Sequence, residues 1–362
     1  MNLNEHAIQV LPALLFGFVV AGAITLAATP VVARFARRFG MVDRPEARRV
    51  NKEVVARGGG IAILLGFVLV AAALLFANTV IGMHFVDEPQ IVKRPQSLAL
   101  LGGAVLATGL GFLDDWLQLR ARWQFVGQIL LAGFAVALGV VVARVNDPLT
   151  PSGFADIPSA LAVVASLLWI VGMINSINFI DGLDGLSSGV ALIAALTLGT
   201  ISLTGTIDQP AIALLCFALA GALLGFLRWN LHPASIFVGT SGVMVIGYVL
   251  ALLAILGSAK VAVALLVLGV PIIDTFWIIV RRLSEGRSPF SPDRGHIHHR
   301  LLDLGLSHLQ TVLVIYAVCI ELAVLSLVLS GTGQMYAFLG VFVIFGLGLF
   351  LLSRAAGGDG AA

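Results

Sequence analysis

Long apolar runs separated by short polar segments follow one another along the whole chain. Each run is close to the roughly 20 residues that an α-helix needs to cross the hydrocarbon core of a bilayer. The pattern predicts an all-α polytopic membrane protein, with about eleven transmembrane helices in a single integral membrane domain over 1–362. The eleven runs lie at about 7–32, 59–81, 97–113, 125–143, 159–177, 186–204, 211–228, 239–256, 261–280, 311–330 and 333–352.

Composition and charge refine this picture. The chain has 362 residues, of which 59% are hydrophobic and 11% charged, far from the balance of a soluble globular domain. No Lys or Arg precedes the first run, which is too long for a signal-peptide core and leads into a basic segment. We therefore expect a retained span and not a cleaved signal.

Basic residues fall in alternate loops. All 21 Lys and Arg except Lys93, Arg94, Arg144 and Lys260 follow runs 1, 3, 7 and 9 or lie in the C-terminal tail. The positive-inside rule then places the N-terminus outside and the C-terminus in the cytoplasm. The predicted cytoplasmic loops are about 33–58, 114–124, 177–186, 228–240 and 281–310; the third holds no basic residue and is assigned by parity.

The most informative polar stretch is N-S-I-N-F-I-D-G-L-D-G-L, which ends the fifth run. Asn175, Asn178, Asp181 and Asp184 recur at every third position. In a helix or a 3₁₀ turn this spacing stacks two amides and two carboxylates along one face. Helix capping alone is the simpler alternative, but a cap needs one polar residue and not four in register. The stretch predicts a ligand or metal site at the membrane surface.

Two further segments carry charge where a spanning helix ends. Run 3 closes with Asp114 and Asp115, although the helix dipole disfavours acids at a C-terminus, which favours a functional role over simple solvation. The first cytoplasmic loop holds eight basic residues that suit anionic lipid headgroups. Within it, Arg57 precedes three glycines, which predicts a close backbone approach to a phosphate that the arginine clamps.

The loop after run 7 reads N-L-H-P-A-S-I-F-V-G-T-S-G. Asn230 and Pro233 mark a tight polar loop. Phe237 is a candidate for stacking on a base, with a membrane-surface anchor as the alternative. The segment 239–242 offers backbone N–H groups and hydroxyls suited to an anion.

The last large loop contains the motif H-I-H-H. Its three histidines, His296, His298 and His299, with Arg294 and Arg300 beside them, form a dense set of donors for phosphate or sugar hydroxyls. Zinc binding is the main competing interpretation, because imidazole is a common zinc ligand.

Several buried positions need partners. Gly221 and Gly225 at GxxxG spacing predict close helix packing. Asp274 and Glu321 lie inside apolar runs, where an acid costs about 2.5–3.5 kcal/mol on insertion scales. Asp274 is two helical turns from Arg281, which suggests a structural pair, and Glu321 has no explanation in the sequence.

These motifs resemble those of the bacterial polyprenyl-phosphate N-acetylhexosamine-1-phosphate transferases. The resemblance covers essentially the whole length and the eleven-span layout. It rests on the D-D pair, N-x-x-N-x-x-D-G-x-D-G-L, N-x-x-P-A-x-I-F and H-I-H-H. The P-D-R lead-in to the last motif is more similar to the N-acetylglucosamine branch than to the muramoyl-pentapeptide branch.

The resemblance implies transfer of N-acetylhexosamine 1-phosphate, most simply GlcNAc 1-phosphate, from a UDP-sugar to undecaprenyl phosphate with release of UMP. This step starts O-antigen, enterobacterial common antigen, teichoic acid or arabinogalactan synthesis. It implies the bacterial cytoplasmic membrane with a cytoplasmic active site, Mg²⁺ with Mn²⁺ as an alternative ion, and no nucleic-acid partner. A homodimer stays open, since the sequence does not reveal oligomeric state.

By the same resemblance, each functional residue receives a role. Asp114, Asp115, Asp181 and Asp184 form the catalytic set, and Asp115, Asp181, Asp184 and Thr240 form the metal set. The lipid phosphate would be deprotonated or oriented by Asp114 or Asp115. Substrate binding falls to Arg57, Asn175, Asn178, Asn230, Phe237, Arg294, His296, His298, His299 and Arg300, with Phe237 stacking on uracil.

The chain also departs from the family pattern. Thr240 stands where the family usually has a metal-binding Asp, and a threonine hydroxyl ligates Mg²⁺ without supplying charge. Asn51, Ala56, Gln118 and Gln124 replace residues that are common in the family. These changes keep open a catalytically weakened relative that binds lipid phosphate or UDP-sugar. A transporter of nucleotide sugars or lipid-linked sugars is a third hypothesis, disfavoured because the polar motifs gather at one face.

Overall fold

The structure is a computed structural model that describes residues 5–43, 54–79, 93–146, 154–204, 208–257, 261–288, 295–329 and 332–358. Nearly all of these residues are helical. The helices are α1 (Glu5–Arg38), α2 (Gly60–Thr79), α3 (Arg94–Leu117), α4 (Ala121–Ala137), α5 (Ser159–Ile180), α6 (Leu186–Ser202), α7 (Pro210–Asn230), α8 (Gly239–Leu256), α9 (Val261–Val267), α10 (Gly269–Ser284), α11 (Ile297–Asp303), α12 (His308–Val328) and α13 (Thr332–Gly358).

The all-α, multi-pass architecture predicted from the sequence is confirmed. Each of the eleven predicted runs overlaps a helix, or in one case the pair α9 and α10. In the part of the chain that the structure describes, 7 helices are long and apolar enough to cross a membrane, or up to 8 if a bent pair counts as one span. The number eleven and the orientation of the termini stay predictions.

Two boundaries differ from the predicted ones and bear on the site. Helix α1 continues to Arg38, so Arg37 lies on the helix, where its guanidinium donates to the Ser235 carbonyl at 3.3 Å. The ninth run is not one straight helix, because α9 and α10 meet at an angle of 79°. Pro271 lies in the first turn of α10, where the missing N–H costs no intrahelical hydrogen bond.

Helices α7 and α8 form the centre of the bundle, and 83% of the apolar stretch of each is buried. The predicted GxxxG packing is confirmed at the crossing of α7 with α1. A Cβ added at Gly221 would lie 2.0 Å from the Phe18 carbonyl oxygen, and one at Gly225 would lie 2.2 Å from the Gly22 carbonyl oxygen. Only glycine allows the two backbones to approach this closely.

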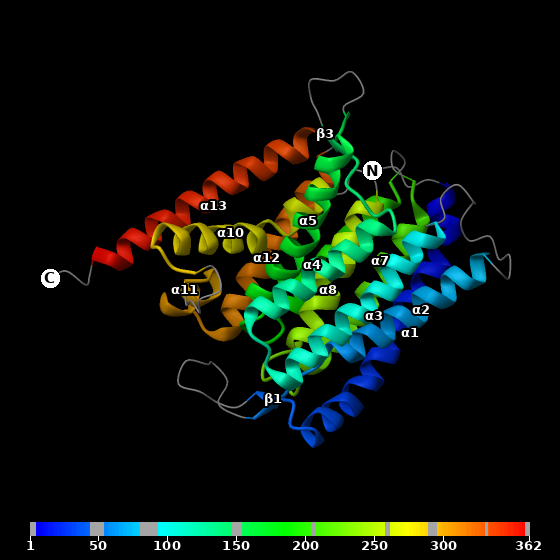
Figure 1. Cartoon of the computed structure of the whole chain (residues 1–362), viewed down its shortest axis with the longest axis horizontal. Coiled ribbons are helices and arrows are strands. Elements are labelled where there is room, and N and C mark those ends of the chain that lie inside the picture. The colour runs from blue at the N-terminus through cyan, green and yellow to red at the C-terminus, as the bar shows by residue number, and fades with distance from the viewer. Residues whose placement is uncertain are drawn as a thin grey trace.

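Two short hairpins mark opposite ends of the bundle (Figure 1). Strands β3 (Arg144–Asn146) and β4 (Phe154–Asp156) pair antiparallel near the end where the N-terminus is drawn. Strands β1 (Val42–Asp43) and β2 (Val55–Ala56) pair antiparallel at the other end. An isolated parallel bridge joins Ala56 to Ile236, so the loop between α7 and α8 is tied to the β1–β2 hairpin.

Candidate active site

Asp115 lies in the last turn of α3 with its carboxylate against the N-terminus of α8. Asp115 is buried, with only 4% of its surface exposed. It accepts hydrogen bonds from the Thr240 N–H at 2.8 Å, the Ser241 N–H at 3.0 Å and the Ser241 hydroxyl at 2.8 Å. The segment 239–242 was predicted to bind an anion, and in the structure that anion is the Asp115 carboxylate of the chain itself.

Asp114 is bonded on both oxygens by uncharged donors. Its Oδ1 accepts from the Leu119 N–H at 3.0 Å and from the Gln124 side-chain amide at 2.7 Å. Its Oδ2 accepts from the Thr240 hydroxyl at 2.6 Å. Thr240 therefore connects the two neighbouring acids, with its hydroxyl on Asp114 and its N–H on Asp115.

The remaining acceptor capacity of the two acids is also next to Thr240. An ionised carboxylate has about four lone-pair positions, two on each oxygen. Among the described residues, Asp114 Oδ1 and Asp115 Oδ2 each receive two hydrogen bonds. Asp114 Oδ2 and Asp115 Oδ1 each receive one, in both cases from Thr240. An additional ligand of these acids would bind beside Thr240.

Arg57 brings positive charge to this group. Its guanidinium lies 3.8 Å from Asp115 Oδ1 and 3.8 Å from Asp43 Oδ1, and its side chain is 28% exposed. The interpretation of the following glycines as a phosphate cradle is not supported. Gly59 and Gly60 donate their N–H groups to the Phe237 and Val238 carbonyls, and a Cβ at Gly60 would lie 2.2 Å from the Gly242 nitrogen. These glycines pack the loop against α8.

The polar stretch at the end of run 5 does not form one continuous helical ladder. Helix α5 ends at Ile180, so Asn175 and Asn178 lie on the helix, Asp181 is its C-cap residue and Asp184 lies in the following turn. Asn175 donates to the Gln128 side-chain oxygen at 2.7 Å and to the Val171 carbonyl at 2.8 Å. The side-chain nitrogen of Asn175 therefore links α5 to Gln128 on α4.

Asp181 interacts electrostatically with Arg57 and with Asp115 of α3. Burial raises the pKa of the Asp181 carboxyl to about 6; the Ser187 hydroxyl, which donates to it, and Arg57 oppose the rise, while Asp115 and Asp184 add to it. A half-buried carboxyl that titrates near neutral pH, next to a second acid and an arginine, is an arrangement suited to handling a proton or a cation.

Asn230 holds the loop between α7 and α8. Its amide oxygen accepts from the Ser188 hydroxyl at 2.7 Å, and its amide nitrogen donates to the Ile236 carbonyl at 3.0 Å. This placement favours a loop-holding role over direct substrate contact. Phe237 in the same loop is half-buried, and its stacking on a base stays a prediction.

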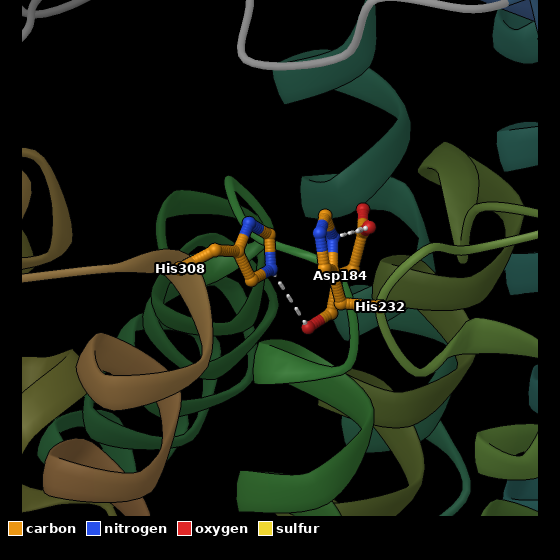
Figure 2. A group of neighbouring side chains, drawn as sticks. All are labelled: Asp184, His232 and His308. Carbon is orange, nitrogen blue, oxygen red and sulfur yellow. Dashed lines mark hydrogen bonds and ion pairs between the residues drawn. The ribbon is translucent and has the colours of Figure 1, made fainter.

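Figure 2 shows the surroundings of Asp184. His232 Nδ1 lies 2.7 Å from Asp184 Oδ2, which also accepts from the Ala234 N–H at 3.1 Å. His308 Nε2 lies 3.4 Å from the Asp184 backbone carbonyl. Asp184, His232 and His308 are the one group of three or more metal-ligating side chains found in the described part of the chain. The three histidines of H-I-H-H do not form such a group among the described residues.

The H-I-H-H motif packs against the turn that holds Asp181 and Asp184. A Cβ at Gly182 would lie 2.2 Å from His298 Nε2, so glycine is required for this contact. His298 is 1% exposed, and burial, followed by His299, His296 and His308, holds its pKa well below the ordinary value. Burial therefore favours the neutral form of the His298 ring, and its Nδ1 has no hydrogen-bond partner among the described residues.

His296 is held by the embedded acid that the sequence suggested would pair with Arg281. Asp274 accepts from the Ile297 N–H at 2.9 Å, and its Oδ2 lies 2.8 Å from His296 Nδ1. The embedded acid is thereby explained, and its partner is a histidine. Arg300 donates to the Gly295 carbonyl at 2.9 Å, while Arg294 lies outside the described residues. Glu321 is on an exposed face of α12, and nothing in the structure explains it.

The oxygen donors around Thr240 fit a magnesium ion in kind. Mg²⁺ prefers carboxylate and hydroxyl oxygens and is commonly held by one or two carboxylates plus substrate phosphates. Asp114 and Asp115 each retain acceptor capacity beside the Thr240 hydroxyl, and Asp181 is close enough to be affected by Asp115. Asp184, in contrast, directs its Oδ2 at His232. The arrangement favours four residues over Asp184 as magnesium ligands: Asp114, Asp115, Asp181 and Thr240.

Sequence reasoning did not find Ser187, His232 and His308. Ser187 donates to Asp181, and the two histidines approach Asp184. Gln124, which the sequence marked only as a departure from the family, donates to Asp114. One signal was present: Ser307 and Gln310 form a capping box that places His308 at the start of α12. No local pattern indicates that this histidine contacts a turn 124 residues earlier.

Comparisons with known proteins agree with this geometry. The family model described as "Glycosyl transferase family 4" matches residues 97–258. A probable undecaprenyl-phosphate N-acetylglucosaminyl 1-phosphate transferase of Bacillus subtilis is 34% identical over 355 residues, 96% of this chain and 92% of the relative. The chain belongs to glycosyl transferase family 4.

Two other members of the family show its breadth. A decaprenyl-phosphate N-acetylglucosaminephosphotransferase of Mycolicibacterium smegmatis is 34% identical over 94% of this chain and 89% of the relative. A phospho-N-acetylmuramoyl-pentapeptide-transferase of Desulforudis audaxviator is 30% identical over 87% of this chain and 97% of the relative. The prediction of a phosphoglycosyl transferase is confirmed at the level of family. The names of these relatives differ in the sugar that is transferred.

Proposed function

We propose that this protein transfers N-acetylglucosamine 1-phosphate from UDP-N-acetylglucosamine to undecaprenyl phosphate and releases UMP, as the initiating step of a cell-envelope polysaccharide. The observation that carries the proposal is the meeting of Asp114, Asp115, Thr240, Arg57 and Asp181 at one end of the bundle. An end of the bundle is where a lipid acceptor in the bilayer and a water-soluble donor meet.

The reaction brings together two anions that repel each other, and residues of the chain reduce this repulsion and orient the lipid phosphate. An oxygen of the lipid phosphate attacks the sugar-bearing phosphorus of the donor, and the bond from that phosphorus to the bridging oxygen breaks, leaving UMP. By analogy with phosphoserine, whose second pKa is about 6, much of the lipid phosphate is already dianionic at pH 7. A strong base is therefore less important than orientation by Asp114 or Asp115 and charge neutralisation by Arg57.

Magnesium is part of the proposal, with Mn²⁺ as an alternative ion. When bound, the ion would supply charge neutralisation for the donor diphosphate. The residues that would hold it are Asp114, Asp115, Asp181 and Thr240. Direct in-line attack is favoured over an aspartyl-phosphate intermediate, because much of the lipid phosphate is already a dianionic nucleophile at pH 7.

Donor recognition is assigned to the H-I-H-H segment and the loop before α8. His296 and His298 pack beside the turn carrying Asp181, where their ring nitrogens suit sugar hydroxyls and phosphate. Phe237 would stack on uracil. The choice of N-acetylglucosamine rests on the names of two relatives that are each 34% identical to this chain. The choice of the bacterial cytoplasmic membrane with a cytoplasmic active site rests on the charge of the loops.

The test is transfer of radiolabelled N-acetylglucosamine 1-phosphate to undecaprenyl phosphate in detergent. We expect activity in the wild type and a loss of about 100-fold or more in kcat/KM for Asp114→Asn and Asp181→Asn. Among the residues that the structure describes, only Ser187 donates a hydrogen bond to Asp181, and its hydroxyl can turn, so that variant is the less disturbing of the two. Asp156→Asn, in the exposed pair with Arg144 at the opposite end, is the matched control and keeps full activity.

Two results would contradict the proposal. Full activity in both site variants would remove the acids from the reaction. A wild type that is folded but inactive with UDP-N-acetylglucosamine, and that still binds the donor, would identify a catalytically weakened relative, the alternative that Thr240 favours.

A further inference from the structure

Three segments far apart in the sequence bring metal-ligating side chains together beside the proposed active site. Asp184 comes from the turn between α5 and α6, His232 from the loop before α8, and His308 from the first turn of α12. One ligand atom from each lies within 4.8 Å of the other two. Figure 2 shows the two imidazole rings on the same side of the turn as the Asp184 side chain.

Hydrogen bonding within the protein leaves this group incompletely satisfied. His308 Nδ1 is buried and has no hydrogen-bond partner among the described residues. Its other nitrogen has only the Asp184 carbonyl, at 3.4 Å, which is beyond the usual distance for a good N–H···O bond. The rings of His232 and His308 stack with centroids 4.2 Å apart.

Further contacts hold two of the three ligands, Asp184 and the helix that carries His308. The Ala234 N–H orients the Asp184 carboxylate. Helix α12 is fixed at its start by the Ser307–Gln310 capping box and further along by Tyr316, whose hydroxyl donates to the Gly185 carbonyl. Outer contacts of this kind orient the first ligands of metal sites in proteins.

The donor set selects a class of ion. Two imidazoles and one carboxylate suit Zn²⁺ and similar first-row ions, whereas Mg²⁺ prefers an all-oxygen shell. Tetrahedral Zn²⁺ with bonds of about 2.0–2.2 Å would place its ligands roughly 3.3 Å apart, so the present atoms need to move by about an ångström or less. The side chain of His232 is 50% exposed, which leaves an approach from solvent.

We propose that Asp184, His232 and His308 bind a divalent ion of the zinc class, with the fourth coordination position open to water or an anionic ligand. The ion would join the Asp181-bearing turn to the loop before α8 and to α12. This site is separate from the oxygen-rich group at Asp114, Asp115 and Thr240. It does not depend on the proposed transferase function, because it concerns a different set of ligands.

The experiment measures bound zinc in the full-length protein, purified without a polyhistidine tag and stripped with a chelator. After Zn²⁺ is added and excess removed by gel filtration, we expect one Zn²⁺ per chain by elemental analysis. Co²⁺ in place of Zn²⁺ should give the visible absorption of a tetrahedral site. Both signals should be lost in His308→Gln and in His232→Asn, and the thermal stabilisation by Zn²⁺ should be lost with them.

His299→Ala is the matched control, because it removes a histidine of the neighbouring motif that lies outside the group. It should bind zinc as the wild type does, and a large excess of Mg²⁺ should not displace Co²⁺ from the wild type. The proposal is overturned if the wild type binds no zinc, if His299→Ala loses zinc as the two ligand variants do, or if Mg²⁺ displaces Co²⁺. None of these readouts uses transferase activity, so the two proposals fail independently.

Discussion

Thr240 is the residue on which the chemistry of the proposed magnesium site depends. Its hydroxyl donates to Asp114 Oδ2 at 2.6 Å and its N–H to Asp115 Oδ1 at 2.8 Å. As an uncharged donor it holds the two acids in place without a cation. An acid at this position would instead face a carboxylate at hydrogen-bond distance and would need a cation between them.

Replacing Thr240 with Asp should make the stability of the protein dependent on Mg²⁺. In metal-free buffer the lost hydroxyl leaves a buried acceptor unsatisfied, at a cost of about 1–3 kcal/mol. Repulsion from Asp114 adds to this cost. The favourable position at a helix N-terminus returns only about 0.3–1 kcal/mol. We expect a lower Tm for Thr240→Asp without Mg²⁺ and a rise on adding Mg²⁺ that exceeds the rise in the wild type.

Thr240→Val separates the metal effect from the lost hydrogen bond. Valine has nearly the shape of threonine and removes the hydroxyl, so its Tm should fall without any recovery on adding Mg²⁺. If Thr240→Asp recovers no more than Thr240→Val does, residue 240 is not at a magnesium site.

At the scale of elements, glycine contacts decide how closely the central helices pack. The Gly221 position on α7 faces the α1 backbone with no room for a Cβ, as the 2.0 Å separation from the Phe18 carbonyl shows. Gly133 on α4 has nothing within 4 Å of an added Cβ. The two glycines therefore have different roles although both lie inside α-helices.

Gly221→Ala should lower the stability of the bundle, and Gly133→Ala should not. Overpacking of a tight interface costs about 1–3 kcal/mol, whereas alanine at an open helical position gains up to about 1 kcal/mol of helix propensity. Thermal unfolding in one detergent, followed by the loss of helical circular dichroism, compares the two variants directly. Equal Tm values for both would show that the α1–α7 crossing adjusts without cost.

The sequence predicts those features of the elements that are determined locally, and it misses those that depend on contacts with other elements. Apolar runs located the helices because spanning a bilayer imposes length and composition locally. The break between α9 and α10 and the pairing of Asp274 with His296 were missed, since both depend on contacts with other elements. For the site, the motifs singled out Asp115 and Asp181, which interact electrostatically in the structure, while their catalytic roles stay predictions. The role of 239–242 as donors to Asp115 required the structure, because 125 residues separate Thr240 from that acid.

At the scale of the whole molecule, the residues of the candidate site come from the ends of alternate helices and lie at one end of the bundle. The β1–β2 hairpin, the end of α3, the turn after α5 and the start of α8 meet through Arg57, Asp115, Asp181 and Thr240. The β3–β4 hairpin lies at the other end (Figure 1). That the loops after runs 1, 3, 5 and 7 share one side of the membrane stays a prediction.

Which side that is follows from the basic residues and can be measured with two engineered cysteines. Asp156→Cys lies in the β3–β4 hairpin, where the native side chain is 78% exposed, and Glu285→Cys follows α10 at a position where it is 44% exposed. The native Cys216 and Cys319 are buried and should react little. With the N-terminus outside, a membrane-impermeant maleimide should label Asp156→Cys in intact spheroplasts and Glu285→Cys only in inverted vesicles. The reverse pattern would place the acids of the site outside the cell, away from any cytoplasmic nucleotide sugar, and would contradict the proposed reaction along with the topology.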